Sequence, residues 1–288
     1  MTARLGPALA LAIALSAVAP PTPAPELPPS PPAQAAEAPT LAPASTPTPV
    51  PWSAGERMDY VIDYLGITMG KAAISVGGTK DGAAPLEISS RAAGVMSVIT
   101  FRQVLVSELD VATLLPRSSV LDAEEPGGYR HTDTARFDRA AHKATVREQG
   151  RFDKSYEIEV PEGTLDFVAL VFRLRTLPLP DGATTAFQVL AGRKVSQVVT
   201  AVVKRELVKT DAGNFPAVKV RVPTGFDGKF SEKNPTYVWF SDDARRVVVK
   251  ISTDFAIGRA EAELSKYRPG QAVAAPAIGP APVTAPSP

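Results

Sequence analysis

From Met58 onward, apolar and polar residues alternate over most of the chain, with short interruptions rich in glycine and proline. A period of two is typical of β-strands that have one side packed on the core and the other side exposed to solvent. Turn signals such as Leu65-Gly66, Pro126-Gly127-Gly128 and the segment 211–214 leave room for about a dozen strands between them. We therefore predict a mainly β fold, in which one large curled antiparallel sheet forms an open or half barrel.

One segment, TLDFVALVFRLRTLPLP from Thr164, breaks this alternation. Thr164 can cap the N-terminus of a helix, and Asp166 suits the positive end of the helix dipole. Pro178 and Pro180 end it. Because apolar residues cover most of its circumference, we expect this helix to be buried in the concavity of the sheet. The apolar residues at helical spacing are Leu165, Phe167, Val168, Val171, Phe172 and Leu174.

Proline marks the limits of the folded domain. Of the 29 prolines, 13 lie in residues 20–51 and 6 in residues 269–288, where the only charged residues are Glu26 and Glu37. Such segments cannot bury enough apolar surface to offset their ordering entropy, so we expect a Pro/Ala-rich linker over 20–51 and a disordered tail over 269–288. Residues 52–268 remain as a single β-rich domain with room for a sizeable core.

Residues 1–19 have the pattern of a secretory signal. Arg4 precedes an apolar run, and Ala17-Val18-Ala19 fits the small-x-small cleavage rule. The run is shorter than the roughly 20 residues that a membrane span needs. We therefore expect a periplasmic or secreted protein. Pro20 is unfavourable after the cut, so an uncleaved leader remains an alternative, and we expect membrane contact only through it.

Charge and cysteine content exclude several classes of function. The 31 basic and 30 acidic residues are nearly balanced and form no basic block, so we expect no nucleic-acid partner. The chain has no cysteine, which excludes disulfides, thiolate metal sites, a cysteine nucleophile and a lipid on an N-terminal cysteine.

Several segments, in this order, resemble a bacterial family known as domain of unknown function 3108. Together they span nearly all of residues 55–267. The resemblance implies an exported, mostly β domain, similar in architecture to the open-barrel carriers that move lipoproteins between membranes, and it implies no catalytic residues. The segments are GERMDYVIDYLGITMGKAAISV, VSELDVATLLPRSSV, ARFDRAAHKATV, LDFVALVFRLRTLPL and TYVWFSDDARRVVVKISTDFAIGRAEAEL.

Adjacent carboxylates at Asp242 and Asp243, followed by Arg245 and Arg246, have two interpretations. A catalytic acid/base pair needs facing positions and divergent pKa values, which neighbours in a loop rarely have. A hairpin tip needs only short polar side chains that bond to the local backbone. The β-rich segments on either side favour the hairpin tip.

The two histidines are weak candidates for a metal site. Alternate residues on a strand point the same way, so His131 and Asp133 can share a face, and His142 could approach from a neighbouring strand. We take both histidines for solvent-facing strand residues, and predict no metal or other cofactor. No nucleophile elbow or H-E-x-x-H motif occurs, so we predict no catalytic residues.

The helix supplies the candidate ligand-binding residues. If the sheet leaves space around it, apolar side chains can line a lipid-sized cavity, although side chains at this spacing usually fill a core. Arg173 and Arg175 point to different sides of the helix. We expect Arg173 to pair with a strand carboxylate or bind an anionic ligand, and Arg175 to reach solvent. The candidates are Val168, Val171, Phe172, Arg173, Trp239 and Phe255.

Three hypotheses for function follow. The first is a non-enzymatic cell-envelope protein that binds a lipid, another apolar ligand or a lipoprotein. The second is a structural or assembly factor that holds another envelope protein through a sheet edge. The third, a hydrolase, has no recognisable motif behind it.

Overall fold

A computed structural model describes residues 50–226, 229–254 and 258–271. The predicted leader and Phe255 lie outside the described residues, as do most of the linker and the tail. No helix in the described part of the chain is long and apolar enough to cross a membrane.

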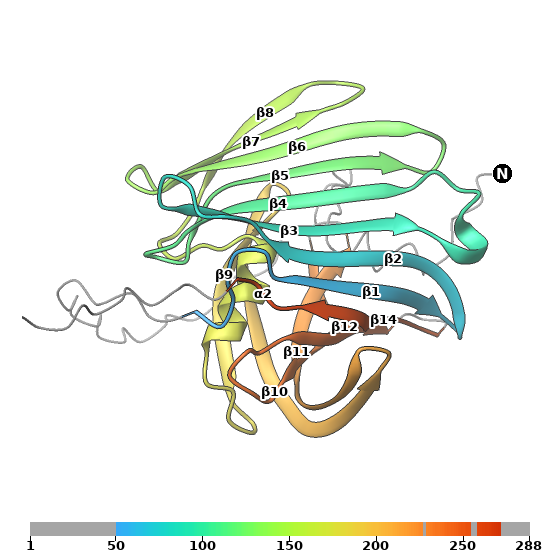
Figure 1. The fold of residues 1–288 in the computed structure, drawn as a ribbon. Coiled ribbons are helices and arrows are strands. Elements are labelled where there is room, and N and C mark those ends of the chain that lie inside the picture. Colours follow the sequence, from blue (N-terminus) through green and yellow to red (C-terminus); the bar gives the residue numbers. More distant parts are fainter. Residues whose placement is uncertain (1–49, 227–228, 255–257, 272–288) are drawn as a thin grey trace, which may run out of the picture.

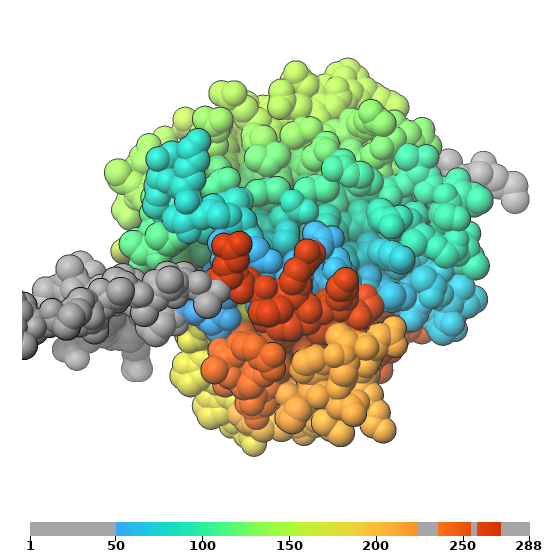
Figure 2. Space-filling view, viewed as in Figure 1, coloured from blue at the N-terminus to red at the C-terminus, as the bar shows by residue number. Residues whose placement is uncertain are grey.

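Within these described residues, fourteen strands form one antiparallel sheet, which confirms the predicted fold class (Figure 1). The strands are β1 (Arg57–Tyr64), β2 (Ile67–Val76), β3 (Ala83–Ala92), β4 (Arg102–Asp110), β5 (Pro116–Glu125), β6 (Tyr129–Asp138), β7 (Lys143–Gln149), β8 (Lys154–Glu159), β9 (Thr184–Ala191), β10 (Lys194–Thr210), β11 (Gly213–Phe226), β12 (Lys229–Ser241), β13 (Val248–Asp254) and β14 (Arg259–Arg268). Their spatial order is β8-β7-β6-β5-β4-β3-β2-β1-β14-β13-β12-β11-β10-β9. Strands that are consecutive in sequence pair with each other, except that β8 and β9 do not and form the two edges of the sheet. In addition, β1 pairs with β14. The two ends of the domain therefore meet in the middle of the sheet, where Figure 2 shows the red C-terminal segment beside the blue N-terminal one.

The sheet curls without closing, and its two edge strands approach each other. Val160, which follows β8, packs with Leu190 of β9 and with Ala144 and Val146 of β7 in a small second core. The segment between the edges adds a short parallel bridge, in which Leu165 pairs with Val189. This connection also carries helix α2 (Phe167–Thr176) into the space that the sheet encloses.

Helix α2 is buried, as its apolar circumference predicted, and packs against β3, β4 and β9. The predicted cap was wrong: Asp166 is the N-cap, and its carboxylate accepts a hydrogen bond of 2.7 Å from the Ala169 amide. Thr164 is fully buried two residues earlier, where its hydroxyl donates to the Pro161 carbonyl. The helix starts later because Leu165 is held extended against β9.

Strand alternation sorts side chains between the core and the outer face. In β1, Met58, Tyr60 and Ile62 are buried in the core, while Arg57 and Asp59 point to the outer face. The hydrophobic residues of the other central strands join the same core around α2. The sheet therefore presents a packed inner face and a charged outer face, as expected when one side is wet.

The segment after β12 is a turn, as the sequence favoured. Asp243 accepts hydrogen bonds from the Ser241 hydroxyl and from the amides of Arg245 and Arg246. Arg246 has a positive φ of 48°, and β13 starts at Val248. Local bonding of a short carboxylate to the backbone explains this tip fully.

Candidate functional site

A buried ion pair anchors the C-terminal end of α2. The Arg175 guanidinium binds both oxygens of the Glu56 carboxylate at 2.8 Å. Its Nε and Nη2 also donate to the backbone carbonyls of Arg246 and Arg245, each at 3.0 Å. Both charged side chains are at most 2% exposed. The expectation that Arg175 reaches solvent was therefore wrong: the β12–β13 turn and Glu56 supply all its partners inside the fold.

Aromatic groups enclose this pair. The rings of Trp52 and Phe172 lie 5.3 and 5.1 Å from the guanidinium carbon of Arg175. The Tyr267 hydroxyl donates to Glu56 at 3.1 Å, and burial, followed by the Glu56 charge, raises the pKa of Tyr267 to about 12. With its charges matched and its donors satisfied, the arrangement holds the N-terminal segment, α2 and β14 together.

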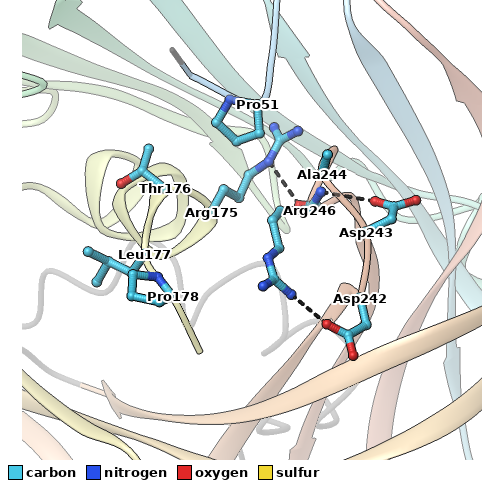
Figure 3. A pocket seen from close by; sticks show the side chains of 9 residues that line it. All are labelled: Pro51, Arg175, Thr176, Leu177, Pro178, Asp242, Asp243, Ala244 and Arg246. Carbon is cyan, nitrogen blue, oxygen red and sulfur yellow. Dashed lines mark hydrogen bonds and ion pairs between the residues drawn. The ribbon is translucent and has the colours of Figure 1, made fainter. Parts of the chain in front are cut away.

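A polar recess of about 350 Å³ lies beside this pair (Figure 3). Burial alone would raise the pKa of Asp242, but hydrogen bonds from Arg205 and Arg246 hold it below its usual value. The pKa of Asp243 shifts the same way, because bonds from Arg245 and Ser241 outweigh its burial. Because the pKa values of both carboxylates are lowered, Asp242 and Asp243 lack the divergent pKa values of an acid/base pair. Its lining residues are Pro51, Arg175, Thr176, Leu177, Pro178, Asp242, Asp243, Ala244 and Arg246.

A larger hollow, which we call the outer hollow, lies on the outer face of β1–β4 and β14. It has a volume of about 620 Å³. Its floor is formed by small residues, with Ala73 opposite Ser89 on neighbouring strands, and long charged side chains stand around it. Five basic and two acidic side chains give it a formal net charge of +3: Arg57, Lys71, Arg91, Arg102 and Lys266 against Asp59 and Glu87.

Three of these cations form a row across the outer hollow. Lys71 lies directly opposite Arg91 on β3, and Arg91 lies directly opposite Arg102 on β4. Arg102 has one exposed ion pair, with Asp122 at 3.1 Å. Lys71 and Arg91 form no ion pair with any residue that the structure describes. Like charges directly opposite on a sheet are destabilising, so this row is a feature that packing alone does not explain.

The histidine prediction was wrong in one respect. His131 faces the inner side of the sheet with only 15% of its side chain exposed, and Nδ1 lies 3.4 Å from Asp133 and Nε2 3.7 Å from Glu125. Hydrogen bonding to Asp133, then to Glu125, raises the pKa of His131 to about 10. His142 lies in the β6–β7 turn with a positive φ of 52°. Within the described ranges, no group of three or more His, Cys, Asp or Glu residues is arranged to hold a metal ion.

Comparison with known families agrees with the resemblance seen in the sequence. Residues 59–265 match the family described as "Protein of unknown function (DUF3108)". The chain belongs to this family. A comparison with curated proteins found no significant match.

One solved structure of a bacterial β-barrel-like protein shares the fold. A β-barrel-like protein of domain of unknown function DUF1849 from Brucella abortus aligns with a TM-score of 0.52 at 12% identity, over 76% of this chain and 98% of that one. A putative lipoprotein from Parabacteroides distasonis aligns over 76% and 97% of the two chains at 10% identity, with a TM-score of 0.32. The first likeness shows a shared fold; the second is too weak to support an argument.

Four of the predicted ligand-binding residues belong to the main hydrophobic core. Val168, Val171 and Phe172 lie together in the core around α2, each at most 3% exposed. Trp239 is only 6% exposed and belongs to the same buried cluster, although it pairs in register with Lys219 and Lys250 and its indole donates to Glu206 at 2.8 Å. Arg173 is half-buried on the helix, where its carbonyl accepts a bond from Thr176.

Proposed function

We propose that this protein is an exported, non-enzymatic cell-envelope protein that binds an anionic ligand in the outer hollow. The ligand class is one that carries phosphate or carboxylate groups, as a lipid headgroup does. The row of Lys71, Arg91 and Arg102 carries the proposal. The signal pattern of residues 1–19 supports export.

The energetics of the row favour a bound anion. Guanidinium and ammonium groups on neighbouring strands repel one another unless an opposite charge lies between them. Arginine binds phosphate and carboxylate oxygens with two parallel hydrogen bonds, and lysine adds a compact charge. A volume of about 620 Å³ is within the usual range of ligand sites.

The earlier hypotheses remain predictions with less support. An apolar ligand or lipoprotein bound against α2 would have to displace side chains that already fill the core. An assembly factor would need an open sheet edge, yet β8 is six residues long and carries Lys154, Glu157 and Glu159, while Leu165 covers part of β9. Short, charged and covered edges oppose pairing with another chain. A hydrolase has no supporting feature in the described residues.

Titration calorimetry at low salt with pyrophosphate as the probe tests the proposal. We expect saturable binding that weakens as salt is added, because exposed charges are screened. The variant Lys71→Gln/Arg91→Gln should lose binding at least about tenfold, since two charge-assisted contacts disappear. The matched variant Lys154→Gln/Lys194→Gln removes the same charge from exposed positions outside the hollow and should bind like the wild type. Absence of saturable binding, or equal loss in both variants, contradicts the proposal.

A further inference from the structure

Four large aliphatic side chains are exposed at one end of the sheet. Leu65 is 62% exposed and Ile67 51% exposed in the β1–β2 hairpin, and Val95 and Val98 are 63% and 89% exposed in the β3–β4 connection. We call these four residues the apolar tips. The two turns lie at the same end of the strands in Figure 1. The β3–β4 connection also contacts β2, because the Ala93 amide donates to the Met69 carbonyl at 3.0 Å.

The conformation of the β1–β2 turn makes this exposure unusual. The loop has two residues, Leu65 and Gly66, with φ angles of 52° and 78°. Two central residues with positive φ define a turn for which Asn-Gly is the strong preference, and a leucine there is strained. Hairpin formation alone does not account for a leucine at this position. The leucine side chain lies beside Gly258, just before β14, and it remains 62% exposed.

The cation row adjoins the apolar tips. Lys71 follows Ile67 by four residues on β2, Arg91 precedes Val95 by four, and Arg102 follows Val98 by four. Ile67 and Lys71 both lie on β2, so at about 3.3 Å per residue they are roughly 13 Å apart, a distance that long side chains partly span. Exposed aliphatic groups next to a row of cations match the two layers of an anionic membrane surface.

We propose that this end of the sheet docks on an anionic lipid bilayer. The apolar tips enter the boundary between headgroups and acyl chains, and Lys71, Arg91 and Arg102 contact lipid phosphates from the outer hollow. The inference rests on the proposed function and names a lipid surface as the source of the anion. It adds a second membrane contact to any that a retained leader makes.

The absence of cysteine allows a site-specific test on the full chain. A Val98→Cys variant labelled with an environment-sensitive fluorophore reports whether that tip enters the bilayer, whatever the leader does. We expect emission to rise and shift to the blue with phosphatidylglycerol vesicles and to stay unchanged with phosphatidylcholine vesicles. The control is Thr79→Cys, an exposed position in the β2–β3 turn at the opposite end of the strands, which should not respond.

A variant of the cation row provides a second test in the same vesicle experiment. Adding Lys71→Gln/Arg91→Gln to labelled Val98→Cys should raise the lipid concentration at half-response about 30-fold, from the usual contribution of a basic residue near an anionic surface. A silent Val98 label, equal responses to both lipids, or a response from the Thr79 label overturns the inference. If the unlabelled protein still binds pyrophosphate in that case, anion binding in the outer hollow is retained as the proposed function. Only docking on a lipid bilayer is then excluded. Loss of pyrophosphate binding as well removes the proposed function.

Discussion

Glu56 and Arg175 are 119 positions apart in sequence, and their carboxylate and guanidinium meet through two hydrogen bonds of 2.8 Å in the core. Glu56 precedes β1, and Arg175 lies in the last turn of a helix inserted between the two edge strands. The pair therefore fastens α2 to the centre of the sheet, because the β12–β13 turn contributes the remaining acceptors. A buried pair of this kind is costly to break from one side.

We predict that Glu56→Ala lowers the free energy of unfolding by about 3–5 kcal/mol, because it leaves the Arg175 charge buried and uncompensated. Urea unfolding followed by tryptophan fluorescence measures the change. Asp122→Ala is the control, since it breaks the exposed pair with Arg102 and should cost no more than about 1 kcal/mol. A similar loss of unfolding free energy in the two variants would show that the buried pair does not stabilise the fold.

A second prediction concerns the cap of α2. Burial raises the pKa of Asp166 above its ordinary value, although bonds from the Ala169 amide and the Ser107 hydroxyl oppose the shift. The folded state then keeps this proton to higher pH than the unfolded chain, so ionisation costs stability as pH rises from the ordinary aspartate range to the raised pKa. Asp166→Asn keeps the cap and removes the titration.

In urea titrations, the difference in stability between Asp166→Asn and the wild type should shift in favour of the variant as pH rises above about 4. Asp166→Ala, which loses the cap as well as the titration, should be less stable than Asp166→Asn by about 1 kcal/mol throughout. A difference that does not change with pH would contradict the inferred shift.

Periodicity was enough to predict the strands, the buried helix and the hairpin tip at Asp242. Alternation reports that neighbouring residues face opposite sides, but not which side is enclosed, and so His131 was placed in solvent although it faces inward. The N-cap of the helix is Asp166 and not the predicted Thr164, because a tertiary bridge at Leu165 overrides the local capping signal.

The candidate site depends on register, which no local pattern contains. Lys71, Arg91 and Arg102 become neighbours only through the lengths of two connections and the pairing of three strands. The Glu56–Arg175 pair likewise depends on how the sheet curls around α2. Outward positions on each strand were recognisable from the alternation, whereas their alignment required the three-dimensional arrangement.

The third prediction follows from His131. Its folded pKa of about 10, raised by Asp133 and then Glu125, exceeds the unfolded value near 6.5. The stabilisation is therefore fully present below pH 6.5 and is lost as pH rises toward 10. His131→Gln should flatten the decline in urea midpoint over this window. An NMR titration that finds the His131 imidazole neutral at pH 8 would contradict the shift.

The last prediction separates folding from membrane docking at a single residue. Leu65→Asn places the preferred residue in a turn whose φ angles are positive, so we expect unfolding stability to stay equal or to rise by up to about 1 kcal/mol. The same change removes one apolar tip, so binding to phosphatidylglycerol vesicles in a sedimentation assay should fall several-fold. Thr79→Asn at the other end of the strands is the control for both measurements. If Leu65→Asn keeps its stability and binds vesicles as tightly as the wild type or more tightly, Leu65 does not contribute to membrane docking.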